Sequence, residues 1–183
     1  MTDVAVIGGG PAGMSAALLT AKNGLETTLF DTGETALHAA YLFNYLGAPD
    51  TDGDAFVDIG HDQIREFDVN VVDAEVTDVA ADEERFTVTA DEEYDAEYVV
   101  FATGRARDLA ESLGCDTTDE GAIDVDLDMH TSVDGVYAAG WAVRPQKIQA
   151  VISAGDGAAA ALDILSTDMG EPFHDFDVPS DAE

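Results

Sequence analysis

The sequence predicts one α/β domain, with a parallel sheet, helices on one face and a small antiparallel meander over about residues 74–101 on the other. Three observations predict it. Short apolar runs of strand length alternate with helical patterns, a glycine-rich turn joins the first strand to the first helix, and no linker or repeat interrupts the chain. Residues 1–167 are therefore expected to form the domain. The acidic residues 168–183 are expected to form a disordered tail.

The amino-terminal elements have the clearest pattern. A buried-strand run, residues 3–7, leads directly into the glycine turn 8–13. Residues 11–23 have the apolar spacing of a helix, and residues 26–30 form a second strand that ends at Asp31. Strand, glycine turn, helix, strand and acid within about 30 residues make the βαβ unit typical of dinucleotide binding.

The later elements are shorter and are predicted from their apolar runs and turn residues. The acidic run 91–93 is interpreted as a hairpin turn. We expect a helix over 54–67, a strand at 69–72, consecutive strands at 74–80, 85–90 and 94–101, a helical turn at 108–114, a strand at 136–140 and a helix over 149–166.

The charge balance is extreme, with 39 acidic against 7 basic residues and a net charge of −32. Such a surface repels phosphate backbones and anionic lipid, which argues against nucleic-acid and membrane binding. The acids are spread along the whole chain, and salt relieves their mutual repulsion. The composition therefore predicts a halophilic, cytoplasmic protein. The absence of an apolar run of about 20 residues and of a secretory signal at the first residues agrees with this expectation.

Other chemistry-bearing residues give no pattern of a catalytic or metal site. Cys115 is the one cysteine, which excludes an internal disulfide and a C-x-x-C motif, and it is interpreted as an incidental thiol in a polar loop. No dedicated catalytic side chain and no metal site is expected. Surface positions are expected for four histidines, and a solvated turn for three alternating acids: His38, His61, His130, His174, Asp50, Asp52 and Asp54.

The glycine turn and the acid have separate roles in holding a dinucleotide. Gly8 permits the tight turn, Gly10 lets the backbone approach a pyrophosphate, and Gly13 allows the helix to pack closely on the strand. Amide groups at the helix start face the phosphates. Asp31 can accept hydrogen bonds from the ribose hydroxyls and would repel a 2′-phosphate, which argues against NADP at this position.

Further segments follow in a defined order: Asn44-Tyr45-Leu46-Gly47, Glu75-Val76-Thr77, Ala102-Thr103-Gly104, the run 131–140 and Gln149-Ala150. With the glycine turn, they resemble the FAD motifs of the flavin domain of thioredoxin reductase and related two-dinucleotide-binding-domain flavoproteins. The resemblance covers residues 2 to about 166. It implies a Rossmann-like domain with FAD as cofactor, bound by Gly8, Gly10, Pro11, Ala12, Gly13, Asp31, Asn44, Val76, Thr103, Gly104, Gly140, Trp141, Gln149 and Ala150.

The chain departs from the family pattern in two places. The family has an inserted NAD(P)H domain after the central motif, which in thioredoxin reductases carries the C-x-x-C. Here the 26 residues from Arg105 to His130 are too few for such a domain. The family also has an aspartate that holds a ribityl hydroxyl where this chain has Trp141. The indole could weaken FAD binding, stack near the cofactor or simply pack.

The expected function is an FAD-dependent oxidoreductase that receives electrons from an external donor, either diffusible NAD(P)H or a protein such as ferredoxin. Disulfide reduction itself is doubtful without the dithiol. The alternative is a non-catalytic FAD or adenine-dinucleotide module that needs a partner chain. Arg105 and Arg107 are interpreted either as guides for an anionic substrate or carrier, or as internal salt-bridge partners. The resemblance also suggests a homodimer.

Overall fold

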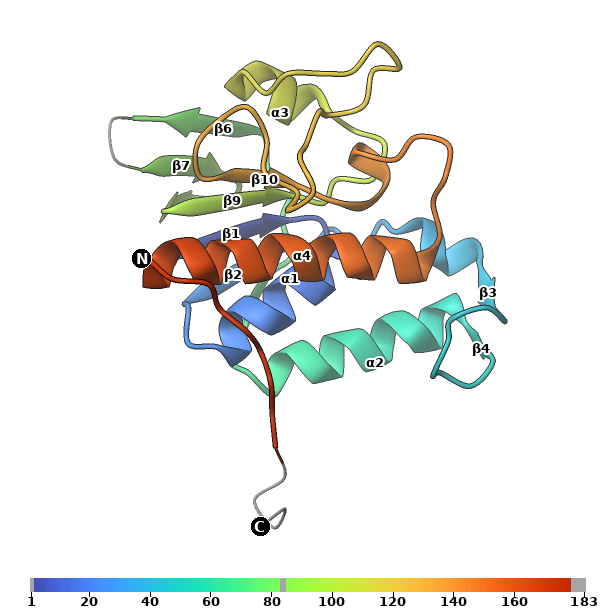
Figure 1. Ribbon diagram of the computed structural model, residues 1–183. Helices are drawn as coiled ribbons and strands as arrows, with labels where there is room; N and C mark the ends of the chain where they lie inside the picture. Colours follow the sequence, from blue (N-terminus) through green and yellow to red (C-terminus); the bar gives the residue numbers. More distant parts are fainter. Residues whose placement is uncertain (1, 83–84, 179–183) are drawn as a thin grey trace.

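A five-stranded parallel sheet forms the centre of the structure. In the computed structural model, which describes residues 2–82 and 85–178, the strands lie in the order β10-β9-β1-β2-β5 (Figure 1). All neighbouring pairs are parallel. Their bounds are β1 Val4–Ile7, β2 Thr27–Phe30, β5 Asn70–Val72, β9 Tyr98–Phe101 and β10 Val136–Ala138.

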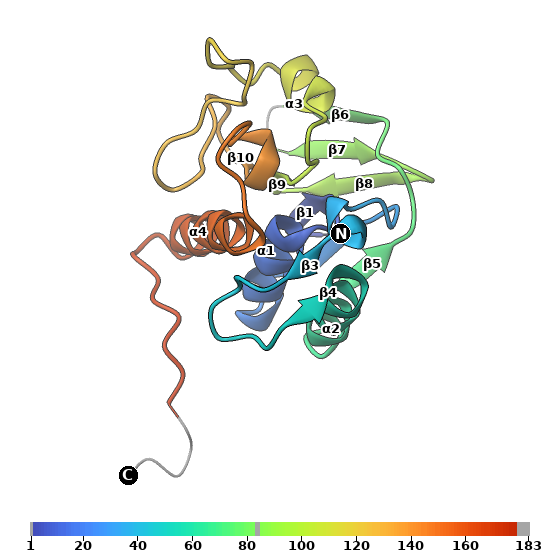
Figure 2. The same cartoon turned by 90° about the vertical axis from the view of Figure 1, so that its right-hand side faces the viewer.

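Two layers cover this sheet (Figures 1 and 2). Helices α1 Pro11–Lys22, α2 Gly53–Arg65 and α4 Ala150–Met169 lie on one face. On the other lie the antiparallel meander β6 Asp78–Ala81, β7 Phe86–Thr89 and β8 Glu93–Ala96 and the short helix α3 Asp108–Leu113. The smaller elements are η1 Ala36–Ala39, the β3 Tyr41–Leu42 and β4 Thr51–Asp52 hairpin, and η2 Gly140–Ala142.

The alternation of side chains along β1 produces two separate apolar cores. Val4 and Val6 point into the cluster formed with α1, α2 and α4, whereas Ala5 and Ile7 belong to the cluster under the meander. Successive side chains of a strand point to opposite faces, so a strand covered on both sides must be apolar throughout. All four residues of β1 are buried. The predicted α/β class is confirmed.

The single strand predicted over 94–101 is wrong. The chain is interrupted at Glu97, and the two halves belong to different sheets: β8 pairs with β7 in the meander, and β9 lies between β1 and β10. The residues explain the division. Glu93–Ala96 mixes charged and apolar positions, as in a half-exposed antiparallel strand, whereas Tyr98–Phe101 is continuously apolar, as in a parallel strand buried on both faces.

Three other element ends differ from the prediction. Residues 74–77 form an irregular connection, and the strand begins only at Asp78. Helix α4 extends to Met169, where Gly170 in the left-handed conformation (φ 70°) ends it. Residues 171–178 form no helix or strand, but Lys22 Nζ lies 2.7 Å from Asp175 and 2.5 Å from Asp177. Residues 179–183 of the predicted tail lie outside the described residues.

Helices α1 and α4 pack with their backbones in contact. A Cβ at Gly157 of α4 would overlap the carbonyl oxygen of Ala12 in α1, so only glycine fits there. The fully buried Ala160 and Ala161 continue this close-packed face. In the described residues, no helix combines the length and apolarity needed to cross a membrane.

We predict that Gly157→Ala lowers the free energy of unfolding by about 1–3 kcal/mol, because the added methyl group forces the two helices apart. Gly155→Ala is the matched control in the same helix. Its added Cβ would meet no atom within 4 Å, and alanine favours helix, so stability should rise by up to about 1 kcal/mol. Urea unfolding in multimolar salt measures both. Equal effects of the two substitutions would contradict the packing described for α1 and α4.

Candidate dinucleotide-binding cleft

A cleft of about 500 Å³ opens at the carboxyl ends of the parallel strands. Its walls are the turns that follow β1, β2, β9 and β10, together with the first turns of α1 and α4. Ligands of open parallel sheets bind at this edge, because the connections and the helix starts converge there. The volume is in the range of about 300–1,000 Å³ that small-molecule sites occupy.

The cleft brings together the predicted cofactor-binding residues except Gly13 and Asn44. Gly13 lies behind the wall, where a Cβ would overlap the carbonyl oxygen of Gly8, so its predicted role in close packing agrees with the geometry. Asn44 Nδ2 donates a hydrogen bond to Gln149 Oε1 at 2.8 Å. Asn44 therefore contacts a wall residue and does not itself line the cleft. The lining residues are Gly8, Gly10, Pro11, Ala12, Asp31, Val76, Thr103, Gly104, Gly140, Trp141, Gln149 and Ala150.

The glycine turn fits closely against its neighbours. Gly8 has a φ of 112°, and a Cβ there would overlap the carbonyl oxygen of Ala102. A Cβ on Gly9 would overlap the Asp31 carboxylate. No role is predicted for Gly9 from the sequence, although an unbroken run of three glycines is itself a signal of close packing. Gly10 is open by contrast, with Thr35 Oγ1 as the nearest atom at 3.5 Å.

Two long helices begin at the cleft without a side-chain cap. The N-cap residues are Gly10 for α1 and Gln149 for α4. The first backbone N–H groups of a helix have no partner within it, and the helix dipole places partial positive charge at this end. Both helix starts therefore favour negative groups in the cleft. A ligand with a pyrophosphate fits this wall.

Asp31 is held firmly at the end of β2. Its side chain is only 8% exposed, Oδ1 accepts a hydrogen bond from Gly33 N at 2.9 Å, and Oδ2 lies 3.0 Å from His61 Nε2. His61 comes from α2, and its side chain is 20% exposed. The surface position expected for His61 is thus wrong. No sequence spacing could have paired two residues thirty positions apart on different elements.

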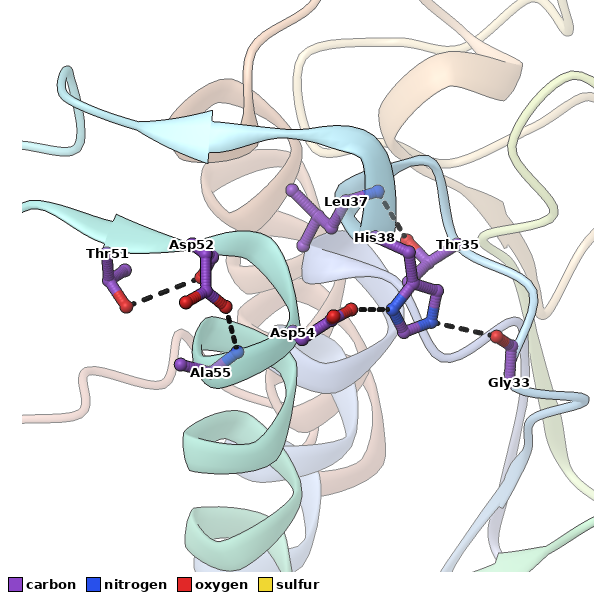
Figure 3. A network of polar contacts seen from close by, with 8 residues as sticks. All are labelled: Gly33, Thr35, Leu37, His38, Thr51, Asp52, Asp54 and Ala55. Atoms are coloured by element: carbon purple, nitrogen blue, oxygen red, sulfur yellow. Dashed lines mark hydrogen bonds and ion pairs between the residues drawn. The ribbon is translucent and has the colours of Figure 1, made fainter.

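A second histidine ties the cleft wall to α2 (Figure 3). The segment 32–40 lines one side of the cleft, and His38 within it contacts the carbonyl oxygen of Gly33 at 2.9 Å and Asp54 Oδ1 at 2.5 Å. Both partners are acceptors, so the two ring nitrogens donate together only in the protonated imidazole. Asp54 first, and Gly33 second, raise the pKa of His38 above its ordinary value of 6.5.

Two of the three alternating acids of the same region, Asp52 and Asp54, have partners within the protein. Asp52 accepts a hydrogen bond from Ala55 N at 2.9 Å and caps α2, and Asp54 pairs with His38 (Figure 3). The geometry is that of a helix cap, not of a calcium loop. No group of three or more His, Cys, Asp or Glu side chains in residues 2–82 and 85–178 is placed to hold a metal ion.

Trp141 lines the far end of the cleft, and two arginines contact it. The Arg105 guanidinium lies over the Trp141 ring, with Cζ 4.0 Å from the centroid. Arg107 donates hydrogen bonds to the carbonyl oxygens of Trp141, at 3.1 Å, and Ala142, at 2.9 Å. Neither arginine pairs with a carboxylate in the described chain, so the salt-bridge interpretation of these residues is wrong. Arg107 fixes the turn that carries Trp141.

Cys115 lies in the loop after α3, as expected, but its side chain is buried. It packs with Ala110 and Ile123 under the meander, and its Sγ lies 3.6 Å from Thr131 Oγ1. Burial raises the pKa of the Cys115 thiol, which keeps it protonated and unreactive. The polar residues that follow Cys115 in the sequence gave no sign that its side chain would be buried.

Comparisons with known proteins show which family the chain resembles. The family profile described as "Pyridine nucleotide-disulphide oxidoreductase" matches residues 2–108 and 51–157. A thioredoxin reductase of Peptoclostridium litorale is 33% identical over 122 residues, which cover 62% of this chain and 36% of that protein. An NAD(P)H coenzyme A polysulfide/persulfide reductase of Pyrococcus horikoshii is 34% identical over 142 residues, which cover 75% of this chain and 29% of that protein. The chain spans about a third of the length of these curated relatives.

Among solved structures, a thioredoxin reductase of Gloeobacter violaceus superposes with a TM-score of 0.86 at 21% identity, covering 97% of this chain and 98% of that one. An atypical thioredoxin reductase of Desulfovibrio vulgaris Hildenborough gives the same TM-score at 18% identity, covering 94% and 100%. At these identities the likeness concerns the fold.

We predict that Asp31→Asn weakens FAD binding by about 10- to 100-fold, because a carboxylate accepts stronger hydrogen bonds than an amide. Glu34→Gln is the matched control, since Glu34 also lines the cleft, is exposed and loses the same charge. Its affinity should change by less than about threefold. Calorimetric titration of the apoprotein measures both. Unchanged affinity in Asp31→Asn would contradict the site assignment.

The His38 contacts predict that the stability of the cleft wall depends on pH. The pKa of His38 is raised in the folded state, so its stabilisation is complete below the unfolded value near 6.5 and disappears as pH rises through the folded pKa. Melting temperatures of the wild type and His38→Gln should differ at acidic pH and converge once the pH exceeds the raised pKa of His38. His174→Gln is the control, because exposed His174 only stacks on Phe176. A difference in melting temperature that does not depend on pH would contradict the stabilising role of the protonated His38.

Proposed function

Because the chain belongs to the pyridine nucleotide-disulphide oxidoreductase family, we propose that it is an FAD-dependent oxidoreductase whose electron donor is external to its own fold. FAD is the cofactor of thioredoxin reductase-like domains of this kind. When bound, it supplies two-electron redox chemistry, and the protein's task is to orient it and adjust its electronics.

The residues of the cleft fit this cofactor from end to end. The open backbone at Gly10 and the first turn of α1 would hold the pyrophosphate, and Asp31 would accept hydrogen bonds from the ribose of the adenosine. The first turn of α4, at Gln149 and Ala150, would face the flavin and stabilise negative charge on its pyrimidine. The amide of Asn44 holds Gln149 in this place.

One observation supports an external donor above all others. The segment between Gly104 and Thr131 contains only the six-residue helix α3 and irregular chain, with no second βαβ unit. The strands that flank it, β9 and β10, are direct neighbours in the sheet. A diffusible NAD(P)H or a protein such as ferredoxin would therefore approach the flavin from outside.

A second candidate is a module without turnover of its own. The chain spans about a third of its curated relatives, so a nucleotide-binding domain on a separate chain could complete it. Disulfide reduction is not part of either proposal, since Cys115 is the one cysteine and is buried. The homodimer and the cytoplasmic location stay predictions from the sequence.

We predict that the protein purified in multimolar salt shows the absorption bands of oxidised flavin and releases FAD on denaturation. Anaerobic titration with NADH, NADPH and reduced ferredoxin then separates the two candidates. Bleaching of the flavin bands and their return in air would support the oxidoreductase. Bound FAD that no donor reduces until a partner chain is added would support the module. A colourless protein that takes up no FAD would overturn the oxidoreductase and leave only a module that binds another adenine dinucleotide.

A further inference from the structure

Cationic side chains are rare in this chain, seven against 39 acidic residues, so a cation without an acidic partner requires an explanation. Arg105, Arg107 and Lys147 make no ion pair with residues 2–82 or 85–178, and Arg107 binds backbone carbonyls instead. Arg105 and Lys147 therefore remain as exposed, unpaired charges. The other four cations each contact a carboxylate: Lys22, Arg65, Arg85 and Arg144.

One unpaired cation contacts Trp141, and the other follows a residue that does. The Arg105 guanidinium covers the indole ring, and the same ring lines the cleft. The indole N–H donates to the carbonyl oxygen of Pro145 at 3.3 Å, and Lys147 follows Pro145 by two residues, within about 8 Å along the backbone. Trp141, with the Arg105 guanidinium over its ring and Lys147 six residues further along the chain, thus borders the end of the cleft where the flavin is proposed to lie.

Other contacts hold this surface in place. Arg107 binds the carbonyls of the turn that carries Trp141. Arg144 makes a bidentate ion pair with Asp156 of α4, whose side chain is 6% exposed, with N–O distances of 2.8–3.0 Å. This pair anchors Arg144, three residues before Lys147, to the helix that lines the cleft. A preorganised surface of this kind loses little entropy when a ligand binds.

The surroundings favour a small ligand over an acidic protein. A stable protein interface covers about 800 Å² on each partner. An interface of that size here would also cover the acidic residues of α3 and of the loop that follows it, which would repel an acidic electron carrier. A ligand with two phosphate charges and a flat ring needs only the two cations and the indole as partners. The acidic residues are Asp108, Glu111, Asp116, Asp119 and Glu120.

We propose that Arg105, Trp141 and Lys147 form a second nucleotide site, which binds the free pyridine dinucleotide that donates electrons to the flavin. The pyrophosphate of the dinucleotide contacts Arg105 and Lys147, and its ring lies at the Trp141 edge of the cleft. This inference rests on the proposed function, because it assumes FAD in the cleft. It locates the donor on the flavin domain itself.

Charge-reversal variants of the FAD-loaded protein test the site. The probe is 1,4,5,6-tetrahydro-NAD, an analogue of NADH that binds but cannot transfer hydride, and calorimetry gives its affinity. We expect Arg105→Glu and Lys147→Glu each to weaken binding at least about tenfold. Arg65→Glu is the matched control, with the same change in net charge on exposed α2, and should change affinity less than about twofold. FAD content should stay the same in all three.

Three results would overturn the inference. If Arg65→Glu weakened binding of the analogue equally, the loss of affinity would be an effect of net charge and not of a specific site. Failure of the wild type to bind the analogue, while reduced ferredoxin still bleaches its FAD, would refute the dinucleotide site and leave the proposed oxidoreductase intact. Absence of FAD from the purified and FAD-supplemented protein would overturn the proposed function, and this site with it. The FAD absorption of each sample distinguishes the last result from the other two.

Discussion

The close approach of backbone to backbone around the start of α1 is the constraint on which the rest of this structure depends. Gly8, Gly13 and Gly157 each lie where a Cβ would overlap a carbonyl oxygen. Because these contacts exclude side chains, the first turn of α1 lies between the glycine turn and α4, and both helices start at the same cleft. The electrostatic character of the site follows from that packing, without any cationic side chain at the phosphate wall.

Local pattern was sufficient to predict the βαβ unit and the long carboxy-terminal helix, because glycine spacing and apolar period are written in neighbouring residues. It failed at Glu97, where one apolar run supplies strands to two different sheets and the choice depends on which partners are available. It also gave no sign that the Cys115 side chain is buried or that His61 is partly buried against Asp31. Their burial depends on contacts with Thr131 and Asp31, which are distant in sequence and leave no spacing to detect.

The scarcity of basic residues makes each one informative. Lys22 attaches the segment after α4 to α1, Arg107 supports the Trp141 turn, and Arg144 holds the loop before α4 through Asp156. In a chain of net charge −32, a cation has many carboxylates available to it. Arg107 contacts carbonyl oxygens and Arg105 an indole ring in preference to those carboxylates, so the position of these two cations in the fold serves more than charge neutralisation.

The pairing of β10 directly with β9 makes the junction between them tolerant of length. Val136 lies opposite Val99, so the chain that leaves β9 returns to the adjacent place in the sheet. The entropy of closing such a loop grows by only about 0.6 kcal/mol for each doubling of its length. Segments of very different size can therefore be exchanged at this point while the sheet and the cleft keep their form. The connection between β9 and β10 is therefore a suitable point at which to insert a sensor or catalytic domain beside a flavin.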